Sequence, residues 1–197
     1  KKKKIWSGEK QVQLRQVTDA DQLKIRLIHQ ELSLAPNLTV AENIFLGREP
    51  VRCGLLQRRE MNRQAEALLT RLGLTEISDV TAVVSQLSTA QQQLVEIARA
   101  LSQEARVLIL DEPTSSLSET EVEALFTTLQ QLKAQGVGII YISHRMEEVT
   151  RLSDRITVLR DGKTVGTAKT GEIEPATLIE WMVGRDIKEH FPRFFFF

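Results

Sequence analysis

With 42% hydrophobic and 26% charged residues, this chain of 197 residues has the composition of an ordinary globular domain and enough apolar material for a core. Lys and Arg total 26 and Asp and Glu total 26, so no basic field points to nucleic acid as a partner. Cys53 is the only cysteine, which excludes an internal disulfide framework and favours a reducing compartment, and no apolar run approaches the ~18 residues of a membrane span.

Both ends of the chain are homopolymers. Residues 1–4 are lysines and residues 194–197 are phenylalanines. Such runs resemble tags or placeholder residues, so we exclude them from the reasoning about the fold.

The first predicted elements are strands. Residues 5–16 alternate loosely around a glycine, which predicts two short strands and a turn. Residues 23–28 predict a further strand, which leads to Gln30 and then to a flexible stretch with Pro36 and Asn37. The simplest interpretation of Gln30 is a glutamine in a surface loop.

Helix signals dominate the next stretch. Thr39 stands three residues before Glu42, which is the spacing of a capping box, so a short helix should begin at Thr39. Residues 49–52, with Pro50, predict a loop. A longer amphipathic helix is predicted from Arg58 to a stop at Gly73, and its apolar side comprises Met61, Ala65, Leu68 and Leu72.

A second capping box, Ser88 with Gln91, predicts another helix. Its apolar face comprises Leu94, Ile97, Ala98 and Leu101. We therefore predict a helical subdomain over residues 32–101, inserted between two parts of a core, residues 5–31 and 102–193.

The central strand is predicted at residues 107–110, four consecutive apolar residues without alternation. This pattern is typical of a strand buried on both faces of a parallel sheet. Asp111 and Glu112 follow it, and ligands of open α/β sheets bind beyond the carboxyl ends of the strands. One carboxylate there can hold Mg²⁺ and the other can accept a proton from water, whereas the simpler alternative is a helix cap with a solvated neighbour.

A strand–helix–strand unit follows the two carboxylates. Ser118 with Glu121 predicts a helix that stops at Gly136, and Val122, Leu125, Leu129 and Leu132 form its buried stripe. The next strand is predicted at residues 138–142. If the two strands are neighbours, Ser143 and His144 emerge at the same sheet edge as Asp111 and Glu112.

The last third predicts a short helix at residues 145–152 and a hairpin of residues 155–160 and 163–167 around Asp161-Gly162. Pro175 opens a final helix that ends before Gly184.

Five motifs stand in the order found in ABC-type ATPases, which this chain therefore resembles: Gln30, residues 87–91, Asp111 with Glu112, residues 116–118 and His144. The resemblance implies an α/β fold like that of P-loop NTPases, with a mostly parallel sheet and an inserted helical subdomain. It also implies ATP and Mg²⁺ as cofactors. By resemblance, Gln30 senses the γ-phosphate and the metal, Asp111 binds the metal, Glu112 is the catalytic base and His144 contacts the γ-phosphate. The implied nucleotide contacts of the signature segment and the D-loop are Ser88, Thr89, Ala90 and Gln91, and Ser116 and Ser118.

Ser88 also suits an anion on physical grounds, because a helix N-terminus offers backbone N–H groups and a favourable dipole. The capping box is the alternative role of Ser88, and both roles can hold together. Thr89 and Ala90 stand where the family usually has two glycines, which bears on how closely the backbone can approach a phosphate.

The phosphate-binding motif Gly-x-x-x-x-Gly-Lys-Ser/Thr has no match. Gly162-Lys163-Thr164 fails because Thr157 occupies the first glycine position and because the segment lies in a predicted hairpin. We expect the missing strand, loop and helix, roughly 30 residues, to lie upstream of Ile5, so that the chain is a partial domain.

Further segments resemble ATP-binding subunits of ribose-, xylose- and galactose-type sugar importers: residues 29–34, 41–49, 141–149, 160–162, 182–185 and 191–192. The resemblance implies the first of two tandem cassettes, which drives import of a monosaccharide from the cytoplasmic face of the membrane. The implied partners are a membrane permease, a second ATP-binding cassette and, indirectly, a sugar-binding protein outside the cell, with no nucleic acid.

Two alternatives differ in class. The chain by itself could be a docking or dimerisation fragment without ATPase activity, since it lacks a phosphate-binding loop. A soluble ABC ATPase acting on DNA or ribosomes is the other, and the balanced charge and the lack of a coiled-coil repeat argue against it.

Overall fold

The structure is a computed structural model that describes residues 5–7, 10–74 and 76–184. The chain divides into two compact units, one up to His144 and one from Arg145 onward, and each is described by itself. The proposed division into a core and a helical subdomain stays a prediction.

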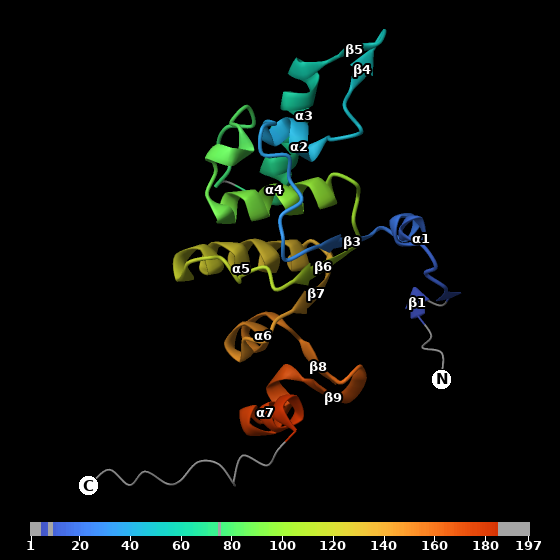
Figure 1. The fold of residues 1–197 in the computed structure, drawn as a ribbon, viewed down its shortest axis with the longest axis vertical. Helices are drawn as coiled ribbons and strands as arrows, with labels where there is room; N and C mark the ends of the chain where they lie inside the picture. Colours follow the sequence, from blue (N-terminus) through green and yellow to red (C-terminus); the bar gives the residue numbers. More distant parts are fainter. Residues whose placement is uncertain (1–4, 8–9, 75, 185–197) are drawn as a thin grey trace, which may run out of the picture. The chain divides into compact units, whose positions relative to one another are not determined.

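A parallel sheet organises the first unit (Figure 1). Its strands are β3 (Ile25–Ile28), β6 (Val107–Asp111) and β7 (Gly138–Ile142), in the order β3-β6-β7. Both pairings are parallel, and Leu110 stands between Ile28 and Tyr141 in the register. Helix α5 (Glu119–Ala134) connects β6 to β7, which confirms the predicted strand–helix–strand unit.

The two faces of this sheet differ in burial. Leu108 and Leu110 are fully buried, whereas Leu27 is 48% and Ile140 51% exposed on the opposite face. Helices α4 (Thr89–Leu101) and α5 pack against each other and against β3 and β7, which places them over the buried face. The prediction that both faces of the strand at 107–110 are buried is therefore wrong for this structure.

The three helices predicted within residues 32–101 are present. They are α2 (Val40–Ile44), α3 (Arg58–Leu72) and α4, and a short 3-10 helix, η1 (Val84–Gln86), was not predicted. The hydroxyls of Thr39 and Ser88 accept the predicted capping hydrogen bonds, and Gly73 ends α3 in the left-handed conformation. The buried side chains between these helices include Val40, Ile44, Met61, Ala65, Leu68, Val95 and Ile97.

Two elements differ from the expectation. The predicted loop at 49–52 includes a strand, because β4 (Val51–Arg52) pairs antiparallel with β5 (Leu55–Leu56) across a two-residue turn. Helix α1 (Val17–Gln22) was not predicted; it begins after Gln16, where Asp19 completes a capping box. Both elements are short, and their turn and cap residues are not the commonest types.

The remaining elements agree with the sequence. Strands β1 (Ile5–Ser7) and β2 (Lys10–Val12) form the predicted antiparallel pair at the start of the chain.

The second unit contains α6 (Met146–Leu152), the hairpin of β8 (Arg155–Arg160) and β9 (Lys163–Lys169), the 3-10 helix η2 (Thr170–Glu172) and α7 (Pro175–Val183). Its buried core comprises Ile156, Val158 and Leu178. Across both units, no helix in the described residues is both long and apolar enough to cross a bilayer.

Candidate functional site

Three chain segments leave the parallel sheet at one edge. Because β3, β6 and β7 run in the same direction, the residues that follow their carboxyl ends lie at this edge. These residues are Gln30 after β3, Asp111 and Glu112 at the end of β6, and His144 after β7. The predicted convergence of the carboxylates and the histidine is confirmed at the level of the sheet.

Glu112 and His144 are in direct contact. The Nδ1 atom of His144 lies 2.9 Å from Oε1 of Glu112. The Glu112 side chain is 31% exposed and the His144 side chain 71% exposed, so both remain accessible to a ligand. The backbone N–H of Glu112 also donates to the carbonyl of Ile142 at 2.9 Å, which fastens the end of β6 to the end of β7.

The backbone of Glu112 is strained. Its φ of +45° lies in the left-handed region, which costs a residue with a Cβ about 1–2 kcal/mol. Strained backbone of this kind often marks a functional site, where the surrounding structure holds a side chain in a required direction. Here the strain turns the chain sharply at the end of the strand, where the Glu112 carboxylate meets the imidazole.

Asp111 and Gln30 are less closely joined. Asp111 is partly buried and stands opposite Ile142 in the sheet, while Gln30 is exposed in the bend after β3. Among the described residues, no hydrogen bond links Gln30 to Asp111 or to Glu112. No group of three or more His, Cys, Asp or Glu side chains in that part of the chain is arranged to hold a metal ion. The role of Asp111 with Gln30 at a metal thus stays a prediction.

Ser88 and Ser118, the N-cap residues of α4 and α5, belong to a second group of predicted site residues. The Ser118 hydroxyl donates to Oε2 of Glu121 at 2.8 Å. The pKa of the Glu121 carboxyl lies below its usual value, first because of the Ser118 backbone N–H and hydroxyl, and further because of the Ser88 hydroxyl and the Ala90 backbone N–H. The N-terminus of α4 therefore lies beside that of α5.

This second group contains the other predicted nucleotide contacts. Ser88, Ser116 and Ser118 are exposed, and Thr89, Ala90 and Gln91 are partly buried. Gln91 completes the capping box by accepting from the Ser88 backbone N–H at 3.0 Å. The predicted site residues thus form two separate groups in the structure. In one group, residues 88–91 lie near residues 116–118; in the other, His144 contacts Glu112.

Two buried polar side chains that the sequence did not single out fix the segment after Gln30. Asn43 is fully buried; its Oδ1 accepts from Ala35 N–H at 2.8 Å and its Nδ2 donates to the Ala35 carbonyl at 3.0 Å. Glu96 is 6% exposed, and its Oε1 accepts from the backbone N–H and the hydroxyl of Ser33, at 2.7 and 2.8 Å. The only sequence signal was a polar residue within the helical pattern at each position.

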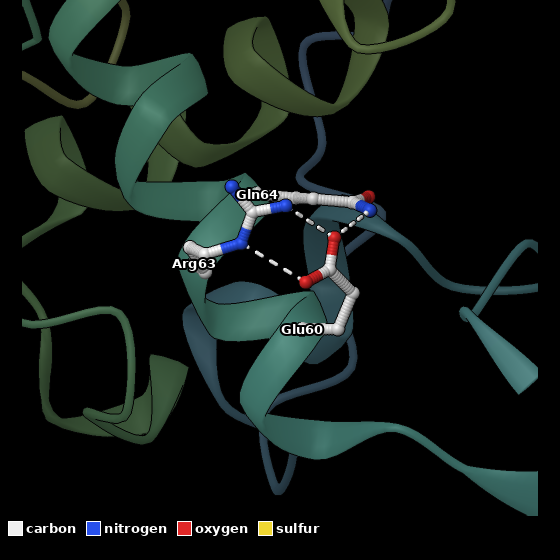
Figure 2. Close-up of polar contacts among 3 residues, drawn as sticks. All are labelled: Glu60, Arg63 and Gln64. Carbon is white, nitrogen blue, oxygen red and sulfur yellow. Dashed lines mark hydrogen bonds and ion pairs between the residues drawn. The ribbon is translucent and has the colours of Figure 1, made fainter.

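Residues from the end of α2, from α3 and from the end of α4 border an open surface pocket of about 330 Å³, lined by Phe45, Arg63, Gln64, Ala67, Leu68, Arg71 and Ser102. Glu60 lies beside it and fixes two of the lining side chains (Figure 2). It accepts from Nε and Nη2 of Arg63 at 2.9 and 2.6 Å, and from Nε2 of Gln64 at 2.7 Å. These bonds, that of Arg63 foremost, lower the pKa of Glu60 to about 2.

Comparison with known proteins places this geometry in context. The ABC transporter family matches residues 2–115 of the chain. A ribose import ATP-binding protein of Geobacillus kaustophilus is 48% identical over 186 residues, which cover 93% of this chain and 37% of that protein. One of Rhodopirellula baltica is 54% identical over 171 residues, which cover 86% and 33%. The chain thus spans about a third of the length of these relatives.

Solved structures agree on the fold. An ATP-binding cassette of an ABC transporter superimposes with a TM-score of 0.73 at 23% identity, over 90% of this chain and 74% of that one. The protein cbiO1 from Clostridium perfringens, part of an ABC transporter complex, superimposes with a TM-score of 0.65 at 25% identity, over 90% and 69%.

Proposed function

Because the chain belongs to the ABC transporter family, we propose that it is part of a nucleotide-binding domain whose longer parent couples ATP hydrolysis to import of a monosaccharide. The observation that carries the proposal is the contact of Glu112 with His144 beside Asp111, at the carboxyl edge of a parallel sheet. The names of the relatives support a sugar, ribose foremost, as the transported substrate.

The donor atoms at this edge fit Mg²⁺. Carboxylate and amide oxygens are hard ligands, and Mg²⁺ usually takes one or two carboxylates and completes its shell with water and phosphate oxygens. Asp111 is the proposed carboxylate ligand, with the Gln30 amide oxygen as a further donor. When bound, the ion would neutralise charge on the phosphates of ATP.

The proposed hydrolysis depends on positioning by this chain's own side chains. Glu112 accepts a proton from the attacking water, or orients that water, and its exposed carboxylate leaves room for it. The contact of His144 Nδ1 with Oε1 fixes the orientation of the Glu112 carboxylate, and the other ring nitrogen of His144 remains for the γ-phosphate.

The second group belongs, in this proposal, to the site of a second cassette. Ser88, Thr89, Ala90 and Gln91 would face a γ-phosphate bound by the partner, and Ser116 and Ser118 would line the same interface. The N-terminus of α4 supports this role because its dipole favours an anion, and a phosphate there would take the place that the Glu121 carboxylate has beside Ser88 and Ala90.

We assign the phosphate-binding loop to the longer parent, in a unit that packs on the exposed face of the sheet. Exposed apolar residues on a parallel sheet support this placement, since such sheets are normally covered on both faces. The proposed partners are a membrane permease, a second cassette and, indirectly, a sugar-binding protein. The parent would then sit at the cytoplasmic face of the membrane.

The test uses the longer parent, reconstituted in vesicles with a candidate membrane permease. We expect ATP turnover that rises when ribose, xylose or galactose is supplied with its binding protein, and uptake of one of these sugars. The present chain alone should show no turnover, since it has no Gly-x-x-x-x-Gly-Lys-Ser/Thr match. Turnover without any sugar uptake would leave an ATPase and refute the import function.

A further inference from the structure

The hairpin of β4 and β5 carries the most exposed large apolar side chain, Leu55, in the described part of the first unit. It extends beyond α3 at the end of the helical segment (Figure 1). Val51 is 60% exposed, Leu55 71% and Leu56 40%. Three neighbouring apolar side chains with this much exposure commonly mark a surface that binds a membrane or another protein.

The turn fixes where these side chains point. Cys53 and Gly54 have φ values of +51° and +78°, as a two-residue type I′ turn requires. The register pairs Val51 with Leu56 and Arg52 with Leu55. Since neighbouring residues of a strand alternate between faces, Val51 and Leu56 lie on one face of the hairpin and Leu55 on the other.

The hairpin and the start of α3 are rich in basic residues. Residues 51–59 contain three arginines, and of the flanking acidic residues Glu49 and Glu60, Glu60 is paired with Arg63. Arg52, Arg58 and Arg59 are exposed, and only Arg58 has an ion pair among the described residues, at 3.7 Å from Glu42. We call Val51, Arg52, Leu55, Leu56, Arg58 and Arg59 the hairpin patch.

We propose that the hairpin patch inserts into the headgroup layer of an anionic lipid bilayer. The hairpin has apolar side chains on both faces. A lipid layer is fluid and can surround both faces of the tip, whereas a rigid protein surface covers only one face, so we favour lipid as the partner. The arginines complement anionic headgroups, and apolar groups beside basic ones are the usual composition of interfacial membrane segments. This inference goes beyond the proposed function, because binding to lipid requires neither nucleotide nor permease.

The test is sedimentation of the chain with vesicles of phosphatidylcholine, with and without about one third phosphatidylglycerol. We expect binding at least ~10-fold stronger with the anionic lipid, and loss of that preference near 1 M salt, where charges are screened over about 3 Å. A polarity-sensitive dye on Cys53, the only cysteine and part of the turn, should shift to shorter wavelength on the same vesicles.

Variants separate the hairpin from other sources of binding. Val51→Ser with Leu55→Ser should weaken binding at least ~10-fold, as expected when two side chains that insert into the bilayer lose their hydrocarbon. Leu159→Ser is the matched control, because Leu159 is 66% exposed in the hairpin of the second unit, and it should bind like the wild type. Arg52→Gln and Arg59→Gln should each weaken binding to anionic vesicles about fivefold.

Every variant is made in a chain whose residues 1–4 and 194–197 are replaced by serine, so that the terminal lysines and phenylalanines contribute nothing. Circular dichroism checks that the variants are folded. Absence of binding to anionic vesicles, or equal binding by the hairpin variant and the Leu159→Ser control, overturns the proposal. The hairpin patch would then be a contact surface for a protein partner such as the permease.

Discussion

Glu112 is the single residue on which the proposed chemistry depends most. Its carboxylate contacts His144 at the sheet edge, next to Asp111. Replacing Glu112 with Gln in the longer parent should lower ATP turnover by ~10²–10⁴-fold, the usual effect of removing a general base, while ATP binding persists. Turnover by a coupled phosphate assay and affinity by nucleotide titration measure the two effects. Unchanged hydrolysis would remove Glu112 from the mechanism.

The strain at Glu112 gives a separate prediction about stability. Glu112→Gly and Glu112→Gln both remove the carboxylate, but only glycine adopts a φ of +45° without a Cβ clash. Glu112→Gly should therefore have a free energy of unfolding about 1 kcal/mol higher than Glu112→Gln, in spite of the greater freedom of glycine in the unfolded chain. Urea unfolding of the two variants decides the matter, and a less stable glycine variant would contradict the assignment of strain.

Lys163 tests the conclusion that Gly162-Lys163-Thr164 is a turn. The structure places this segment in the hairpin of β8 and β9, with positive φ at Asp161 and Gly162. Lys163→Ala in the parent should thus leave nucleotide affinity within about twofold of the wild type, because no phosphate-binding loop is involved. A large loss of affinity, seen in the same titration as for the Glu112 variant, would reassign the loop to this hairpin.

At the scale of elements, the segment after Gln30 is held between two helices. Asn43 of α2 and Glu96 of α4 bind its backbone at Ala35 and Ser33, and both side chains are buried. We therefore expect a change at Gln30 to be transmitted to the helices rather than absorbed by a loose loop. In the proposed parent, this segment and the start of α2 would carry motion between the nucleotide and the permease.

Residues 38–45 should accordingly couple transport to hydrolysis. Phe45 lies at the end of α2 and lines the surface pocket, so Phe45→Ala removes contact area there while leaving the carboxyl edge of the sheet intact. We expect sugar uptake to fall at least ~10-fold while ATP turnover stays within about twofold. Both rates are measured in the same reconstituted vesicles, with Leu159→Ala as a surface control. A proportional fall in both rates would show that Phe45 is only structural.

At the scale of the whole molecule, one face of the sheet of β3, β6 and β7 exposes apolar side chains. Leu27, Ile109 and Ile140 stand side by side across the three strands on that face. If the parent covers it, Leu27→Ser with Ile140→Ser should lower the parent's free energy of unfolding by about 3 kcal/mol or more, and that of the present chain by less than about 1 kcal/mol. Denaturant unfolding of both lengths measures this difference. Equal effects would mean that the face stays uncovered.

The sequence by itself determined the local features. Helix starts at Thr39, Ser88 and Ser118 and the helix stop at Gly73 follow from hydrogen bonds within a few residues, so the order of residues decides them. The strand that delivers Asp111 and Glu112 was also predicted from its apolar run, although such a run does not by itself distinguish a strand from a buried helix segment.

Only the tertiary structure decided which distant groups meet. His144 contacts Glu112 across 32 positions of sequence because β6 and β7 are neighbours in a fixed parallel register. Which face of the sheet is covered depends on where α4 and α5 pack, and the burial of Asn43 and Glu96 depends on the backbone groups that each of them binds. A local pattern states which residues are apolar or polar, but the partner that satisfies each one is chosen by packing between segments far apart in the chain.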